Sequence, residues 1–226
     1  MSHFVDAWNA SYVRLENTLF YPSEAVVAFV NKNIRRRIGH DRFDREFASP
    51  PVVLDFGSGA GRHLRFLCEN GYHPIGIEIS GEACKQARAL LSHSGLSDFE
   101  IYESDGGRLP IADASVDYAI SVATFDSMTR LDAASSAAEV YRTLRDGGLF
   151  YADLISDTSV RSGRELAKGE FLIDEAHENG TVQLFYNKDD IDSVFAAFKL
   201  RSRRLHQVID DHGGVISARW ECVFGK

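Results

Sequence analysis

A glycine-rich loop between a predicted strand and a predicted helix constrains this sequence more than any other feature. The segment reads VLDFGSGAG, from Val53 to Gly61, and its apolar strand ends beside the acid Asp55. Gly57, Gly59 and Gly61 lack a Cβ, so the backbone can turn tightly there and approach a ligand closely. A strand, a glycine loop and a helix in this order predict the ligand-binding loop of an α/β protein.

The chain around this loop alternates between short apolar runs and helical patterns, which is typical of a parallel sheet with helices on both faces. The expected parallel strands are 52–56, 74–79, 99–103, 116–121 and 149–155, and the expected helices are one ending near 70, then 81–93 and 131–144. A turn at 146–148 precedes the fifth strand, a short helix covers 189–198, and runs at 200–209 and 215–224 flank the turn 211–214. The sequence therefore predicts an α/β fold whose mixed sheet has seven strands and ends in an antiparallel hairpin.

Two segments lie outside this alternation. Residues 23–38 predict an amphipathic helix with Ser23 as its cap, and the aromatic-rich stretch 8–21 precedes it. We expect residues 1–48 to form an N-terminal helical arm or lid, and residues 49–226 to form the main domain. Within 156–187, the pieces GEFLI and TVQLFYN on either side of HENG predict an inserted hairpin near the site.

Composition limits the classes of partner. The formal net charge of -8 disfavours a nucleic-acid backbone, which is bound mainly by clustered Lys and Arg. The short basic clusters 35–37 and 201–204 are expected to be solvated faces. The three cysteines are odd in number and lie outside any C-x-x-C pattern, which predicts reduced thiols. No apolar run is long enough for a membrane span, so a cytoplasmic protein is expected.

The glycine spacing distinguishes between two kinds of ligand. A dinucleotide loop of the form G-x-G-x-x-G would need its third glycine at position 62, where this chain has Arg62. Asp55 would also repel a pyrophosphate, whereas a carboxylate favours a ligand that carries an ammonium and a sulfonium group. The loop therefore predicts a cationic ligand.

The segment Asp55 to Gly61 resembles the first motif of the class I S-adenosylmethionine-dependent methyltransferases, which is an acid, one residue and then G-x-G-x-G. The resemblance implies that the loop holds the methionine part of S-adenosylmethionine and that Glu78, at the end of 74–79, binds both ribose hydroxyls. Asp105 lies in SDGGRLPIADASVDYAIS and corresponds to the family's acceptor for the adenine amino group. The similarity is greatest to the small-molecule, methyltransferase type 11-like group.

The resemblance extends to further cofactor contacts and to the order of the strands. Gly106 is expected to offer a backbone amide to adenine, Phe125 to form an apolar wall, and His63 either to touch the methionine carboxylate or to pack. The implied order of the Rossmann-like sheet is 3-2-1-4-5-7-6, with strand 7 antiparallel. The predicted cofactor-binding residues are Asp55, Gly57, Ser58, Gly59, Gly61, His63, Glu78, Ile79, Asp105, Gly106 and Phe125.

The predicted activity is methyl transfer to a small-molecule acceptor, more specifically to an oxygen of a sugar or secondary metabolite. A hydroxyl acceptor needs a base to take its proton. The candidates are Asp126 in ATFDSM, His206 in the final hairpin and Tyr21 in the arm. No metal site is expected, no nucleic acid or membrane is expected as a partner, and a monomer or a homodimer fits equally well.

Three alternatives stay open at this stage. An RNA or protein methyltransferase would need a basic or extended docking surface, and the chain reads SVATFD where amino-group methylases have an N-P-P-Y-type tetrapeptide. A non-catalytic S-adenosylmethionine-binding protein would have its acceptor pocket filled, for example by Phe125. Aminopropyl transfer would use the same cofactor pocket with a decarboxylated ligand. The acceptor itself depends on the arm and on 156–187, where the resemblance ends.

Overall fold

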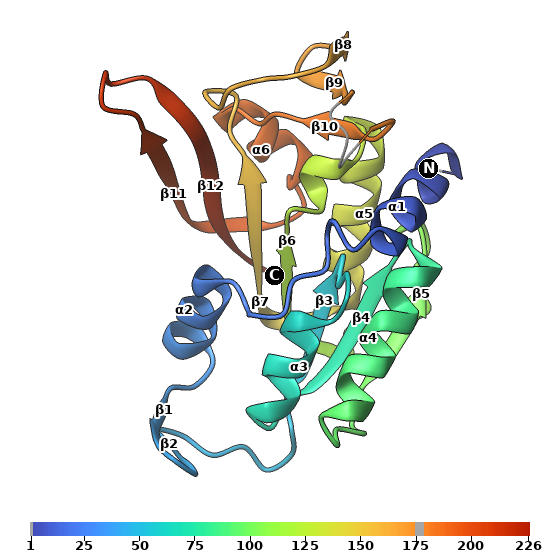
Figure 1. Cartoon of the computed structure of the whole chain (residues 1–226). Helices are drawn as coiled ribbons and strands as arrows, with labels where there is room; N and C mark the ends of the chain where they lie inside the picture. Colours follow the sequence, from blue (N-terminus) through green and yellow to red (C-terminus); the bar gives the residue numbers. More distant parts are fainter. Residues whose placement is uncertain (1, 175–178) are drawn as a thin grey trace.

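A seven-stranded mixed sheet organises the part of the chain that the computed structural model describes, residues 2–174 and 179–226 (Figure 1). In chain order its elements are α1 (Ser2–Val13), α2 (Glu24–Asn33), β1 (Arg37–Gly39), β2 (Arg42–Phe43), β3 (Val52–Phe56), α3 (Arg62–Glu69), β4 (His73–Glu78), α4 (Gly81–His93), β5 (Glu100–Glu103), β6 (Val116–Val122), the 3-10 helix η1 (Phe125–Ser127), α5 (Arg130–Thr143), β7 (Leu144–Ile155), β8 (Arg164–Ala167), β9 (Glu170–Leu172), β10 (Val182–Leu184), α6 (Lys188–Val194), β11 (Lys199–Ile209) and β12 (Val215–Gly225).

The strand order of the main sheet is β11-β12-β7-β6-β3-β4-β5. The strands β3, β4, β5, β6 and β7 pair in parallel, and β12 pairs antiparallel with both β7 and β11. If these seven strands are numbered in chain order, the observed order is the predicted 3-2-1-4-5-7-6, and the antiparallel strand 7 is β12. The predicted fold class is therefore confirmed. From β3 the chain adds β4 and β5 on one side of the sheet and then returns to add β6 and β7 on the other. Open α/β sheets bind ligands at such a switch point.

Helices cover the sheet on both faces, because successive residues of a buried parallel strand point to opposite sides. On one side Val53 and Ile120 pack with apolar residues of α2 and α3, while α4 packs with α3 over Ile101 of β5. On the other side Leu54 and Phe150 pack with α5 and α6. This sandwich holds the carboxyl ends of the strands rigidly.

Two predicted segments differ in detail. The predicted turn at 146–148 lies inside β7, which begins at Leu144; the pairing of β7 with β6 is irregular there and Gly147 has φ +80°. A positive φ is accessible to glycine, so the strand bulges without ending. The predicted hairpin within 156–187 is a three-stranded antiparallel sheet, β10-β9-β8, and residues 175–178 of its connection lie outside the described residues.

The helix predicted over 23–38 is shorter than expected. It ends at Asn33, and Ser23 occupies the N-cap position without a side-chain hydrogen bond. Arg35 is buried, because its Nη2 donates to Asn70 O at 2.5 Å at the end of α3 and its guanidinium lies 3.8 Å from the ring centre of Phe43. The expectation of a solvated basic face is therefore wrong for Arg35, which caps a neighbouring helix.

Candidate functional site

A cavity lies where β3, β4 and β6 end, and the N-terminal arm forms its other side. Eight of the predicted cofactor residues line it: Gly57, Ser58, Gly59, His63, Glu78, Ile79, Asp105 and Gly106. Asp55, Gly61 and Phe125 do not belong to its lining. The sequence therefore located the cavity, and the structure separates the residues on its surface from those behind it.

The first two loop glycines are required by close packing. Gly57 has φ +81°, and a Cβ there would lie 2.0 Å from Oγ1 of Thr124, at the end of β6. Gly59 has φ +52°, and a Cβ there would lie 2.7 Å from the hydroxyl of Tyr12, in α1. Any larger residue would push the loop away from these neighbours, so both glycines keep the loop close to β6 and to α1.

The third glycine packs against a neighbouring helix and does not belong to the lining of the cavity. Gly61 precedes α3 with φ +90°, and a Cβ there would lie 2.9 Å from Cβ of Ala87 in α4. Gly61 therefore allows α3 and α4 to pack closely behind the loop, and its predicted contact with the ligand stays a prediction.

Glu78 connects the loop to the neighbouring strand. Its Oε2 accepts a hydrogen bond from Gly59 N at 2.9 Å, and its Oε1 accepts one from Ser80 N at 2.9 Å. Burial raises the pKa of Glu78, while these backbone donors oppose the shift. A carboxylate held at a cavity wall by two amides still has lone pairs for the two hydroxyls of a ribose.

Asp55 lies directly behind the loop. It is 1% exposed, and neither carboxylate oxygen has a hydrogen-bond partner among the described residues. Its nearest basic group is His63, whose Nδ1 is 3.8 Å from Asp55 Oδ2. Buried polar groups normally find partners. An unpartnered buried carboxylate beside a glycine loop therefore fits a ligand with an ammonium group.

Two basic side chains follow the loop. Ser23 N donates to His63 Nε2 at 3.2 Å, which joins α3 to the start of α2 and favours the packing alternative predicted for this histidine. Arg62 lines the cavity and was missed as a site residue. Its guanidinium forms no ion pair with the described residues and reaches only Tyr21 O, at 3.5 Å. Burial lowers the pKa of Arg62, so an anionic ligand group would stabilise it.

The far end of the cavity carries the predicted adenine contacts. Asp105 is exposed at the rim and accepts a hydrogen bond from Gly107 N at 3.0 Å. Gly106 N donates to Ser104 Oγ at 3.3 Å, so its amide already has a partner. Phe125 is fully buried among Phe56, Phe150 and Phe195 beneath the site. The prediction that Phe125 is a cavity wall is wrong, because its ring belongs to the aromatic core.

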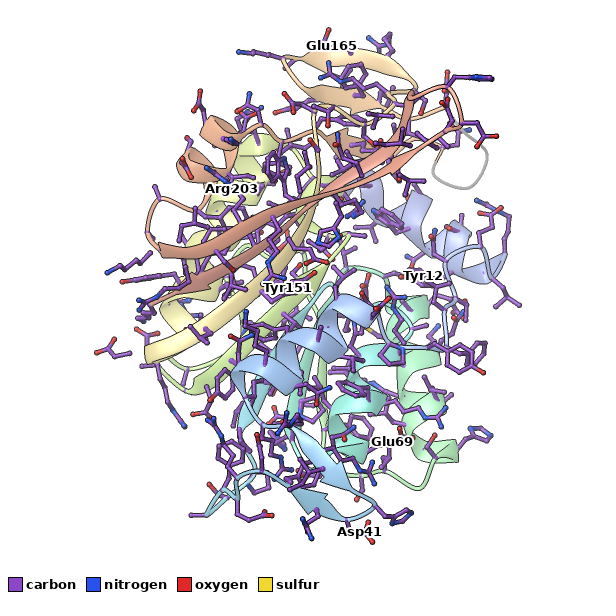
Figure 2. The ribbon with its side chains drawn as sticks, turned by 90° about the vertical axis from the view of Figure 1, so that its left-hand side faces the viewer. Tyr12, Asp41, Glu69, Tyr151, Glu165 and Arg203 are labelled. Atoms are coloured by element: carbon purple, nitrogen blue, oxygen red, sulfur yellow. The ribbon has the colours of Figure 1, made fainter. Side chains whose placement is uncertain are left out.

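The N-terminal arm supplies the wall that faces the loop. Phe4, Trp8 and Tyr12 line the cavity from one side of α1, and Figure 2 shows Tyr12 beside the helices that follow the loop. Asn9 Oδ1 accepts from Ser80 Oγ at 2.7 Å, which fastens α1 to the start of α4. The i, i+4, i+8 spacing of these aromatic residues is a sequence signal that could have identified them.

The three predicted acceptor-side residues lie outside the lining of the cavity. Asp126 is buried and accepts from Arg219 Nη2 at 2.6 Å. His206 lies on β11 with Nε2 3.1 Å from Glu221 Oε2, and Tyr21 is 86% exposed. The structure therefore does not bring these three side chains together, and their catalytic role stays a prediction.

Three further observations concern other predicted properties. In 2–174 and 179–226, no group of three or more His, Cys, Asp or Glu side chains is arranged to hold a metal ion. None of the helices in these ranges is long and apolar enough to cross a membrane. All three cysteines are free, and Cys84 and Cys222 are buried.

Comparisons with known proteins agree with this geometry. The family model described as "Methyltransferase domain" matches residues 54–152. The malonyl-[acyl-carrier protein] O-methyltransferase of Geobacter sulfurreducens is 27% identical over 176 residues, which are 77% of this chain. This chain spans 64% of the length of that relative.

Solved structures show the same fold. A S-adenosylmethionine-dependent methyltransferase from Methanosarcina mazei matches with a TM-score of 0.66 at 20% identity, over 79% of this chain and 94% of that one. The Burkholderia thailandensis 1,6-didemethyltoxoflavin-N1-methyltransferase, solved with 1,6-didemethyltoxoflavin and S-adenosylhomocysteine, matches with a TM-score of 0.64 at 14% identity, over 100% of this chain and 86% of that one.

The sheet order and the glycine loop define a class I methyltransferase fold, with the loop on the switch point. Residues 54–152 match the methyltransferase-domain family, and the described sheet has the fold of the class I S-adenosylmethionine-dependent methyltransferases. The family, the methyltransferase activity and the S-adenosylmethionine cofactor predicted from the sequence agree with these matches.

Proposed function

We propose that this protein binds S-adenosylmethionine in the cavity and transfers its methyl group to a small-molecule acceptor. The observation that carries the proposal is the unpartnered, buried carboxylate of Asp55 behind the glycine loop, on the strand next to the one that ends in Glu78. One carboxylate suits a cationic ligand group and the other a diol, and S-adenosylmethionine carries both.

Each end of the cofactor has a candidate partner. The loop 57–59 would contact the methionine end with Asp55 directly behind it, and Arg62 would hold the carboxylate. Glu78 would accept hydrogen bonds from the ribose hydroxyls, and Asp105 would accept one from the adenine amino group at the rim. Ser58, Ile79 and Gly106 would complete the contact surface, while Gly61 supports it from behind.

The chemistry requires little proton transfer from the protein at the leaving group. Bound S-adenosylmethionine supplies an electrophilic methyl group. The chain's own contribution is to hold the acceptor in line with that methyl in a cavity that excludes water; positioning of this kind is worth up to roughly 7 to 11 kcal/mol in favourable cases. The apolar residues Phe4, Trp8 and Met128 line the cavity and would exclude water on the side that the loop does not cover.

The acceptor side favours an organic metabolite with a partly apolar body. Leu19 and the same apolar residues supply a hydrophobic surface, and Asn17 and Ser127 are polar groups within it. This pattern is typical of small-molecule sites, in which a few polar groups fix the orientation of a ligand. An oxygen of a sugar or secondary metabolite remains the proposed target, and a cytoplasmic location and a lid role for the arm are parts of the same proposal.

The test is calorimetric titration of the full chain with S-adenosylhomocysteine. Micromolar binding is expected for the unsubstituted protein and for Glu69→Ala, a carboxylate change on the outer side of α3. Asp55→Ala and Glu78→Ala are expected to abolish binding. A folded protein that does not bind S-adenosylhomocysteine would contradict the proposed function. With binding established, release of S-adenosylhomocysteine from S-adenosylmethionine in the presence of candidate acceptors identifies the substrate.

A further inference from the structure

The strand β11 leaves one edge of the main sheet open. It has 11 residues, stands last in the strand order, and pairs only with β12 in the part of the chain that the structure describes. Residues 204–209 are all exposed, and the hairpin extends away from the helical layers at its tip (Figure 1). A long edge presents unpaired N–H and C=O groups, which other strands can bind.

The exposed edge also carries apolar side chains. Leu205 is 37% exposed, Val208 is 56% exposed and Ile209 is 55% exposed. Leu205 and Ile209 share a face because side chains alternate along a strand, and Val208 lies on the opposite face. The register of β11 against β12 is regular from 202 to 208. It shifts between 208 and 209, where the extra residue, Ile216, belongs to β12, so the alternation along β11 holds across the segment.

Charged residues flank the apolar segment in a self-complementary way. Arg204 precedes it, and Asp210 follows it. Arg204 has no ion-pair partner among the described residues. Asp210 is exposed, and its Oδ1 accepts from His212 N and Gly214 N, both at 2.8 Å, which fixes its carboxylate at the hairpin tip. One end of the segment is therefore basic and the other acidic.

We propose that two copies of this chain associate through β11, with their edge strands antiparallel about a two-fold axis at Gln207. This register places Leu205 opposite Ile209 of the second copy, and Arg204 opposite Asp210 of the second copy. Each apolar pair and each opposite-charge pair occurs twice, because the interface is symmetric. The two seven-stranded sheets then form one continuous sheet.

Neighbouring registers are less favourable. Two residues that lie opposite each other in antiparallel strands point to the same face of the sheet. Between two identical strands this holds only if the two-fold axis passes beside a residue and not between two residues. An axis at His206 places Arg204 opposite Val208. An axis at Val208 places Leu205 opposite the acid Asp211. Only the register centred on Gln207 satisfies the apolar and the charged positions together.

The experiment is sedimentation velocity of the full chain over a range of concentrations. The unsubstituted protein is expected to be a dimer. Leu205→Lys alone and Ile209→Glu alone are each expected to raise the dimer dissociation constant by about tenfold or more, because a charge replaces an apolar pair. In the double variant Leu205→Lys/Ile209→Glu, the introduced charges face each other across the axis, so dimerisation is expected to recover.

The matched control is Leu205→Lys/Val208→Glu. It introduces the same two charges, but Val208 lies on the other face of the strand, so no recovery is expected. All these positions are exposed and outside the cavity, so binding of S-adenosylhomocysteine, or thermal unfolding if nothing binds, reports whether each variant is folded. A monomeric unsubstituted protein, a dimer unaffected by the single changes, or equal recovery in the control would overturn the proposal.

Discussion

Arg219 of β12 donates from Nη2 to Asp126 Oδ2 at 2.6 Å and from Nε to Asp153 Oδ1 at 2.6 Å. The first bond ties the final hairpin to η1, whose residue Ser127 lines the cavity. Asp126 also accepts from Ile155 N at 3.1 Å. Both bonds reach Oδ2, while Oδ1 is buried without a hydrogen-bond partner among the described residues, so Asp126 fastens η1 to the hairpin and to β7 through one oxygen.

Substitution of the two partners should have unequal effects. Arg219→Leu is expected to lower the free energy of unfolding by about 3 kcal/mol, because it leaves the buried Asp126 without its cation. Asp126→Asn is expected to lower it by about 1 to 2 kcal/mol, because Arg219 retains Asp153. Urea unfolding of both variants measures the difference.

The pH dependence of the first variant checks the cause. Burial raises the pKa of Asp126, and Arg219 opposes that shift. Without Arg219, the pKa of Asp126 rises further, so the destabilisation should shrink as the pH falls below that pKa and protonation removes the unpaired charge. A destabilisation that does not change with pH would point to lost packing instead.

Cofactor affinity should depend on pH through Glu78. Burial raises the pKa of this carboxyl, and the two ribose hydroxyls need two acceptor oxygens, which the ionised carboxylate offers and the protonated acid does not offer equally, because one of its oxygens then carries a proton. Affinity for S-adenosylhomocysteine is therefore expected to increase as the pH rises through the pKa of Glu78 and then to level off. Titration between about pH 4 and pH 8 measures this, and Glu78→Gln, which cannot ionise, should bind weakly without that rise. An equal rise in both proteins would assign the effect to another group.

Arg62 should recognise the amino-acid end of the ligand. Arg62→Ala is expected to weaken S-adenosylhomocysteine binding by about 10- to 100-fold, the usual effect of losing a charged hydrogen bond. 5′-Deoxy-5′-methylthioadenosine lacks the carboxylate, so its affinity should be nearly the same in the two proteins. If both ligands weaken equally, Arg62 acts on the shape of the cavity and not on the carboxylate.

Gly61 should matter for stability more than for ligand contact. Gly61→Ala is expected to lower the free energy of unfolding by about 2 kcal/mol or more, because φ is +90° and the new Cβ would meet Ala87. Adding Ala87→Gly relieves the overlap, so the two changes together should cost less than their sum. Strict additivity in denaturant unfolding would show that only backbone strain is involved.

The sheet was predictable because the central parallel strands β3, β4 and β6 are mostly buried on both faces and each parallel strand is followed by a helix or turn signal. The loop position and Glu78 followed from the same regularity, since both lie at carboxyl ends of adjacent strands. Motif spacing alone did not distinguish residues that line the cavity from residues that hold the surrounding structure together. Asp117 lies in the motif segment but accepts from Val52 N at 2.8 Å at the opposite end of the strands.

The arm and the acceptor-side residues were less predictable for a physical reason. Their positions depend on contacts between distant segments, such as Asn9 with Ser80 or Arg219 with Asp126, and no local pattern specifies such pairs. Arg35 shows the same limit, because charge alone predicts exposure while stacking and helix capping bury it.

The wall contributed by α1 lies entirely outside residues 54–152, which the family model matches. One wall of the cavity's acceptor side is thus encoded separately from the loop that would hold the cofactor, while Ser127 and Met128 of the same side lie within the matched residues. A lineage could change its substrate by altering Phe4 and Trp8 on this helical face while keeping Tyr12, whose hydroxyl lies against the loop at Gly59. The same separation offers a practical route to redesign, in which residues of α1 are varied while residues 54–152 are kept unchanged.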